Sequence, residues 1–389
     1  GGVLTGADID NFNVVFKYEV RKLAGATYRV TADSPIYAPD NSLLYQKGDI
    51  VADNLTTNEN GEVSLNNVPL GTYVIEEIAA PTGYVLATEK QRLTLSYAGQ
   101  EAEIAFDETT FTNERQKVSV HVIKQDSETK KTLKGAEFAI YAGSEIMSYK
   151  GDHLVSAGSM IETAKTDADG NITFKADLPL GFKYVVREVE APVGYIASKE
   201  EFSFAASAAE PTKKTITYEH TFTDDHITAK INLVKKDTET GTAQGDAQLA
   251  GAVYGLYARE PIVYPDGKSG TIHEKDALVG TMTTNAQGEA SIEGLYLGKY
   301  YVKEITPSLG YNLDDTDYEV DCSKAETGTV QLEVKCVVKE QVMKQPAEII
   351  KAANNGKTDA DLIEGAGFKA WLISDLTVRT DGSYDFSSA

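Results

Sequence analysis

A short motif recurs at nearly equal intervals along the chain, and this repeat limits the possible architectures more than any other feature. The motif is Ala-Gly, Lys-Gly or Glu-Gly followed by Ala and a short apolar run. Its glycines are Gly25, Gly135, Gly251 and Gly365, which lie 110, 116 and 114 residues apart. A repeat of this length indicates tandem copies of one domain-sized structural unit.

The residues around this motif predict an all-β fold. Val, Ile, Thr and Tyr recur in short alternating runs, which are typical of strands. A turn with Asn or Asp in second place and Gly in fifth recurs at Thr57, Thr166 and Thr284, and this is β-turn chemistry. About seven short strands in each repeat predict an immunoglobulin-like β-sandwich.

The repeat divides the chain into modules. We expect β-sandwiches at 1–115 (module 1), 116–226 (module 2) and 227–341 (module 3), and the start of a fourth, incomplete module at 342–389. The linkers between them are very short, so we expect an elongated, stiff array rather than loosely tethered domains.

Charge and motif content argue against several classes of function. The formal net charge is −22, which repels nucleic-acid phosphates. No apolar run approaches the roughly 20 residues of a membrane-spanning helix. The five His residues show no metal-ligand spacing, and the common nucleotide-binding and hydrolase motifs are missing from the sequence. We therefore expect no metal, no cofactor and no enzyme with turnover.

Another repeated element carries a resemblance to a known family. It reads Tyr-x-x-x-Glu-x-x-Ala-Pro-x-Gly-Tyr from Tyr73 and again from Tyr184. A third copy from Tyr300 lacks the Ala and has its proline, Pro307, one place early. The element resembles the signature of collagen-adhesin B-type, or SpaA-type prealbumin-like, domains of Gram-positive surface proteins and pilins. The resemblance covers nearly the whole chain and implies an inverse-immunoglobulin, transthyretin-like sandwich in each module.

Many members of that family form an isopeptide bond between a first-strand Lys and a last-strand Asn or Asp, assisted by the Glu of this element. Burial lowers the pKa of the Lys and raises that of the Glu, so that a neutral amine attacks while the carboxyl stabilises the oxyanion. The resemblance implies such a bond in two modules, formed by Lys17, Glu77 and Asn113 in module 1 and by Lys124, Glu188 and Asp224 in module 2.

Spacing and alternation were compared with these assignments. Asn113 precedes Lys124 by 11 residues, and Asp224 precedes Lys235 by the same number. The first strand of module 1 is less clear, because Phe16 and the alternating apolar residues before it lie on the face opposite Lys17.

Module 3 departs from the pattern. It has Lys235 and Glu304, but Glu340 stands where Asn or Asp is expected. The extra methylene is expected to misplace the carbonyl, so we predict no bond there.

Both cysteines lie in module 3. Cys322 and Cys336 flank a turn around Gly328, which suggests facing strands of one hairpin. A disulfide is expected in the oxidising environment of a surface protein, and two reduced, buried thiols are the alternative.

These observations predict a structural stalk of a Gram-positive cell-wall surface protein or pilin. The chain shows neither a signal peptide nor a sorting signal, so we expect a segment of a longer extracellular protein whose anchor lies outside it. Its expected partners are neighbouring modules of the same protein. The alternative function is adhesion, in which the long loops at 142–163 and 259–278 bind a host or environmental glycan or protein.

Overall fold

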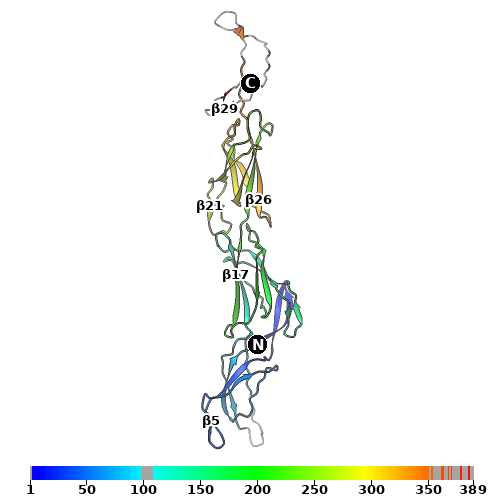
Figure 1. The fold of residues 1–389 in the computed structure, drawn as a ribbon, viewed down its shortest axis with the longest axis vertical. Helices are drawn as coiled ribbons and strands as arrows, with labels where there is room; N and C mark the ends of the chain where they lie inside the picture. The colour runs from blue at the N-terminus through cyan, green and yellow to red at the C-terminus, as the bar shows by residue number, and fades with distance from the viewer. Residues whose placement is uncertain are drawn as a thin grey trace. The chain divides into compact units, whose positions relative to one another are not determined.

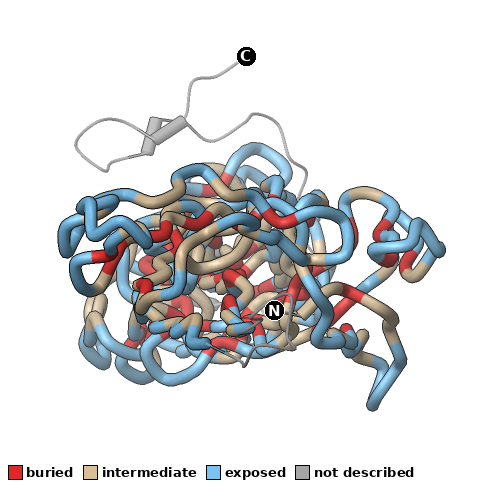
Figure 2. Tube along the Cα trace, turned by 90° about the horizontal axis from the view of Figure 1, so that it is seen from below, coloured by how far each residue is buried: buried red, intermediate tan, exposed pale blue. Residues whose placement is uncertain are grey.

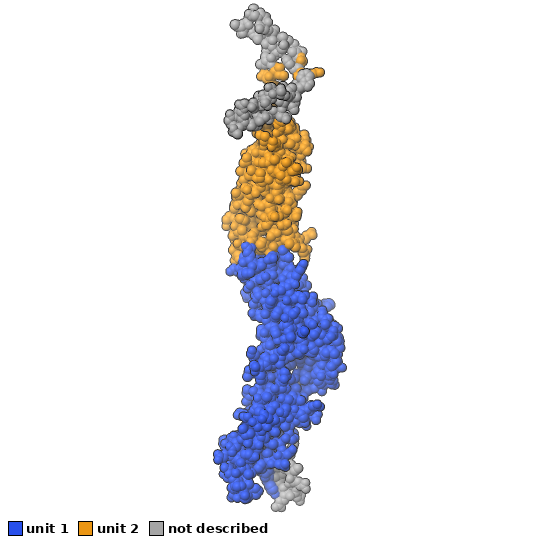
Figure 3. Space-filling view, in the orientation of Figure 1, with its two compact units in different colours: residues 1–225 blue, residues 226–389 orange. Residues whose placement is uncertain are grey.

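The computed structural model describes residues 2–97 and 108–349, together with residues 352–353, 361–362, 367, 369, 377–378 and 384–385. Strands, turns and irregular segments make up this described part, and no helix occurs in it (Figure 1). The predicted all-β class is confirmed. The chain forms two compact units, residues 1–225 and residues 226–389, which are described separately below (Figure 3).

Module 2 is a sandwich of two sheets within the first compact unit. One sheet has the strand order β13-β10-β15-β16, the other has the order β14-β9-β17, and β11-β12 form a small hairpin. The strands are β9 (Lys117–Asp126), β10 (Glu137–Ala142), β11 (Ile146–Met147), β12 (His153–Val155), β13 (Met160–Lys165), β14 (Asn171–Thr173), β15 (Lys183–Glu190), β16 (Glu201–Ala205) and β17 (Thr215–Asp224).

Alternation along these strands produces the core of module 2. Every second residue of β9 is buried, starting from Val118 and ending at Asp126 (Figure 2). Phe138, Tyr184 and Phe222 are fully buried in the same apolar cluster. The first strand β9 and the last strand β17 pair in parallel, which requires the rest of the module to lie between them in sequence.

Module 3, in the second compact unit, repeats this topology. Its sheets have the orders β22-β19-β24-β25 and β23-β18-β26, with a small β20-β21 hairpin. The strands are β18 (Thr228–Asp237), β19 (Val253–Ala258), β20 (Ile262–Val263), β21 (Thr271–His273), β22 (Leu278–Thr283), β23 (Glu289–Tyr296), β24 (Lys299–Thr306), β25 (Tyr318–Asp321) and β26 (Gln331–Glu340). Strands β18 and β26 again form a parallel pair along ten residues each.

Module 1 shows only one of the two sheets in its described residues. This sheet has the order β6-β3-β7-β8, and β4-β5 form a hairpin beside it. The strands are β3 (Thr27–Ala32), β4 (Ile36–Tyr37), β5 (Leu43–Tyr45), β6 (Ile50–Thr56), β7 (Gly71–Ala79) and β8 (Gln91–Leu95). The fully buried cluster is correspondingly small, and consists of Val30, Ala32, Ile36 and Tyr73.

The first two strands of the chain do not join the sheet of module 1. Strands β1 (Gly2–Asp10) and β2 (Asn13–Val20) form a separate antiparallel hairpin, called here the N-terminal hairpin. Leu4 and Phe16 of this hairpin belong to the apolar core of module 2. Tyr18 adds a hydrogen bond of 2.7 Å from its hydroxyl to the carbonyl oxygen of Asp177.

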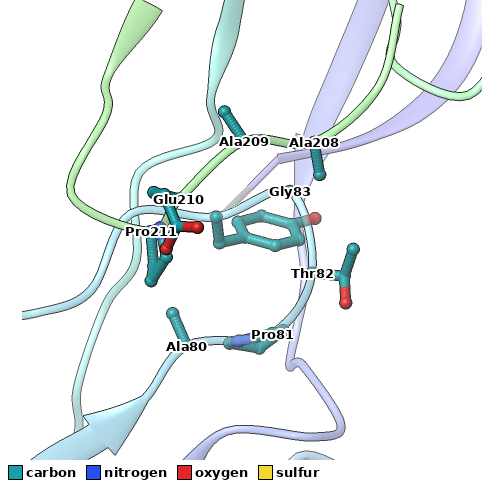
Figure 4. A pocket seen from close by; sticks show the side chains of 9 residues that line it. Ala80, Pro81, Thr82, Gly83, Ala208, Ala209, Glu210 and Pro211 are labelled. Carbon is teal, nitrogen blue, oxygen red and sulfur yellow. The ribbon is translucent and has the colours of Figure 1, made fainter.

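Modules 1 and 2 are also tied together where one chain segment passes into the next. The buried side chain of Gln116 donates to the carbonyl oxygens of Glu210 (3.0 Å) and Lys213 (2.9 Å). Beside it, an open depression is lined by Ala80 to Tyr84 and by Ala208 to Pro211 (Figure 4). Glu210 is the single titratable acid or base among these residues, so the depression offers little specific chemistry.

The expected fourth module lies mostly outside the described residues. What is described there consists of two short antiparallel pairs. Their strands are β27 (Ala352–Ala353), β28 (Asp361–Leu362), β29 (Thr377–Val378) and β30 (Tyr384–Asp385).

Candidate isopeptide sites

In module 2 the structure brings the three expected side chains together. Lys124 on β9 is fully buried, and its Nζ lies 3.0 Å from Oε1 of Glu188 on β15. The same Nζ contacts Oδ1 of Asp224, the last residue of β17. A fully buried lysine is rare unless it is paired, so the two carboxyl groups are what make its burial tolerable.

Strand register explains how residues so distant in sequence meet. Lys124 is the parallel partner of Phe222, two residues before Asp224 on β17, so both face the core side. Glu188 is the partner of Phe138 on the opposite sheet and faces the same core. The rings of Phe138 and Phe222 lie 4.9 Å apart and form an apolar wall beside the lysine.

Burial sets the ionisation of these groups. Removal from water raises the pKa of Glu188 to about 7, against the opposing effect of Lys124 and with a further upward contribution from Asp224. Burial likewise raises the pKa of Asp224. The N–H of Ser198 donates to Oε2 of Glu188 (2.6 Å) and to Oδ1 of Asp224 (3.1 Å), which holds both carboxyl groups in place.

In module 3 the corresponding side chains also meet. Lys235 is fully buried, its Nζ lies 3.4 Å from Oε1 of Glu304, and it contacts Oε2 of Glu340. The expectation that the extra methylene carries the Glu340 carboxyl away from the lysine is therefore wrong in its geometry. Burial lowers the pKa of Lys235, while Glu304 acts in the opposite direction.

Module 1 holds the acceptor and the assisting carboxyl without the amine. Glu77 and Asn113 are both buried, and Nδ2 of Asn113 donates to Oε2 of Glu77 at 2.7 Å. The same Oε2 accepts the N–H of Ala87 at 2.6 Å. The structure thus assembles two of the three expected groups of this module.

Lys17 lies elsewhere, on the N-terminal hairpin. Its side chain is 58% exposed and forms an ion pair with Asp8 across that hairpin. Because Phe16 points into the core of module 2, alternation directs Lys17 to the opposite, solvent-facing side. Within residues 2–97 and 108–349, no lysine forms an ion pair with Glu77, so the expected set of Lys17, Glu77 and Asn113 is not brought together.

A pair of residues missed in the sequence marks the two modules whose lysine is in place. In module 2, the hydroxyl of Tyr195 donates to Oδ2 of Asp126 at 2.7 Å. In module 3, Tyr311 donates to Oδ2 of Asp237 at 3.2 Å. Each Asp comes two residues after the buried lysine, whereas Lys17 is followed at that position by Glu19. The Lys-x-Asp pattern was therefore the available signal that Lys17 differs from the other two.

The expected disulfide is wrong. Cys322 and Cys336 are both free and buried. They do not lie on one hairpin, because Cys336 is on β26 and Cys322 directly follows β25, and these strands belong to different sheets. Both side chains pack into the core of module 3, and burial raises the pKa of each thiol to about 11.

The two long loops considered for adhesion are partly ordered as strands. The segment 142–163 contains the β11-β12 hairpin, and the segment 259–278 contains the β20-β21 hairpin. Ile146 and Ile262 of these hairpins are buried in the cores of their modules, so each hairpin also serves its own sandwich.

Comparison with known proteins agrees with this architecture. The model of the SpaA prealbumin-like fold domain matches three times, at residues 16–110, 118–220 and 229–335. The chain belongs to the SpaA prealbumin-like fold domain family. No protein of established function that was compared by sequence matches this SpaA-type chain.

Solved structures show the same kind of relationship. The Bacillus anthracis TIE protein is similar at 25% sequence identity with a TM-score of 0.52, over 82% of this chain and 48% of that one. The SpaA-type chain thus spans about half the length of that protein. The major pilin subunit BcpA of Bacillus cereus is similar at 13% identity with a TM-score of 0.31, over 82% and 95% of the two chains. The Streptococcus agalactiae minor pilin GBS52 is similar at 18% identity with a TM-score of 0.24, over 60% and 99%.

Proposed function

We propose that the chain is a structural stalk segment of a Gram-positive cell-surface protein or pilin, and that module 2 locks itself with an amide bond between Lys124 and Asp224. The observation that carries this proposal is the buried contact of Lys124 with both Glu188 and Asp224. Family membership and the tandem SpaA-type modules support the structural role.

The bond requires no external reagent. A neutral Lys124 Nζ attacks Cγ of Asp224, and a protonated Glu188 donates to the carboxyl oxygen that gains charge. One N–C bond forms, one C–O bond breaks, and the departing oxygen leaves as water with protons from the amine and from the carboxyl groups. The raised pKa of Glu188, about 7, keeps a large share of this carboxyl protonated near neutral pH. The fold supplies proximity in place of a second substrate.

The position of the bond suits a load-bearing module. Strands β9 and β17 are the first and last strands of module 2 and run in parallel. Tension applied at the ends of the module would pass along β9 to Lys124, across the amide and out at Asp224. The chain between residues 124 and 224 would then carry no load, and the hydrogen-bonded core would be protected from unfolding.

Location and partners follow from the same proposal. A stalk segment acts outside the cell, joined to neighbouring modules of its own protein and attached to the cell wall through a segment other than these modules. The described residues contain no helix with the length and apolarity needed to cross a membrane.

Mass spectrometry tests the proposed bond. The purified chain should contain a branched peptide joining Lys124 to Asp224 whose mass is lower by one water than the sum of its two parts. Glu188→Ala should abolish this branch and leave the protein folded enough to purify. Recovery of Lys124 and Asp224 only in linear peptides from the unmodified chain would reject the bond, while the fold assignment would stand.

A further inference from the structure

The lysine of module 3 contacts a glutamate that departs from the Asn or Asp pattern of the family. Nζ of Lys235 contacts Oε2 of Glu340, and both side chains are fully buried. We propose that Lys235 and Glu340 join in an amide bond, with Glu304 and Tyr254 as the assisting groups. This would be a second modification site, one methylene longer than that of module 2, and it does not require the module 2 bond.

Backbone register shows that the longer acceptor is accommodated by side chains alone. Lys235 on β18 is the parallel partner of Val338, and Glu340 follows two residues later. This offset equals that of Lys124, Phe222 and Asp224 in module 2. The two strands therefore sit in the same register in both modules, and the additional methylene of Glu340 must be taken up within the core.

A second difference between the modules lies at the place where Glu340 needs a partner. The residue paired with the assisting glutamate is Phe138 in module 2 and Tyr254 in module 3. The hydroxyl of Tyr254 donates to Oε1 of Glu340 and lies 3.5 Å from Nζ of Lys235. Tyr254 thus supplies a hydrogen-bond donor that a phenylalanine cannot, and it fixes the orientation of the longer carboxyl group.

The contacts assign a role to each oxygen of Glu340. Oε1 is held by Tyr254, which places a donor on the oxygen that becomes the amide carbonyl. Oε2 faces Lys235 and is without a hydrogen-bond partner among the described residues, as expected of an oxygen that departs. Glu304 lies beside the amine at 3.4 Å and is oriented by the N–H of Asp314, which donates to its Oε2 at 2.9 Å.

These contacts describe a balanced condensation. A neutral Lys235 Nζ attacks Cδ of Glu340, one N–C bond forms, and the C–Oε2 bond breaks. Glu304 accepts a proton from the amine and returns it to Oε2, which leaves as water. Burial, which lowers the pKa of Lys235, favours the neutral amine that this step requires.

Peptide mapping of the full chain tests the proposal directly. A tryptic branch should join residues 231–236, uncut after Lys235, to a peptide containing Glu340, with the mass of one water missing. Glu340→Gln keeps the reaction but loses ammonia, so the mature variant should have the same mass as the mature unmodified chain. Lys235→Met should remove the branch.

Two further variants separate this bond from a stable buried ion pair. Tyr254→Phe and Glu304→Gln should lower the fraction of branched peptide, whereas an ion pair predicts no branch in any variant. Glu188→Ala serves as the matched control, since it should remove the module 2 branch and leave the Lys235 branch intact. Linear peptides carrying free Lys235 and free Glu340 in the unmodified chain would overturn the proposal, whatever the result for module 2.

Discussion

Modules 1 and 2 hold equivalent acceptor groups, yet only module 2 holds an amine between them. Glu77 and Asn113 hydrogen-bond each other directly in module 1, whereas Lys124 stands between Glu188 and Asp224 in module 2. The difference arises from the first strand. In module 2 that strand, β9, pairs with β17, but in module 1 the corresponding residues form the N-terminal hairpin. Buried acceptor chemistry alone is therefore not evidence for a cross-link.

The largest expected effect comes from replacing the two lysines. Lys124→Met should destabilise module 2 by about 4.7 kcal/mol, the value that the chain-entropy model gives for a cross-link closing a loop of about 100 residues. Lys17→Met should change the stability of either module by no more than about 1 kcal/mol, because an exposed ion pair contributes little. Proteolysis during denaturant titration, with fragments identified by mass, measures both. Equal losses would break the comparison.

The packing of the N-terminal hairpin can be tested next. Phe16→Ala should destabilise module 2 by about 3 kcal/mol, because a buried aromatic side chain is lost from that core. Hydrogen exchange should then rise in β13, which packs against β2. Val15→Ala on the exposed side of the same strand is the matched control. Faster exchange confined to β3 and β7 would show that the hairpin belongs to module 1 instead.

Exchanging the acceptors sharpens the chemical difference between the modules. Asn113→Asp should cost module 1 about 1–3 kcal/mol, because it replaces the amide donor of a buried hydrogen bond by a second carboxyl group. The loss should grow as pH rises, since two ionised carboxylates cannot share the site. In module 2, Asp224→Asn should retain the cross-link by losing ammonia instead of water. A denaturation series over pH, with intact mass, tests both; a pH-independent loss in module 1 would contradict this account.

The smallest effect concerns the second tyrosine of the repeated element. Tyr195→Phe should cost module 2 about 2 kcal/mol, because its hydroxyl donates to the buried carboxylate of Asp126. Tyr84→Phe in module 1 should cost about 1 kcal/mol, since that hydroxyl donates to the neutral carbonyl oxygen of Gly2. Thermal unfolding of the two variants measures the difference. A larger loss for Tyr84→Phe would mean that Asp126 is not the anchor of the lysine strand.

Much of the candidate site could be predicted from local patterns. The positions of Glu188 and Asp224 within strands follow from alternation and from the repeat spacing, and the structure places both beside Lys124. Lys17 could not be placed in this way, because its strand carries apolar residues on one face and the choice of core is a long-range competition. The Lys-x-Asp pattern, present at Lys124 and Lys235, was the one local signal that distinguished them.

The sequence by itself determined the tandem all-β modules, their strand periodicity and the chemical types of the buried groups, because these depend on side-chain alternation and turn residues near in the chain. Only the tertiary structure decided which side chains meet. It placed the N-terminal hairpin on the core of module 2, put Cys322 and Cys336 in different sheets, and brought Glu340 to Lys235. The physical reason is that these contacts join residues far apart in sequence, where burial of apolar surface and the pairing of buried charges outweigh local preference.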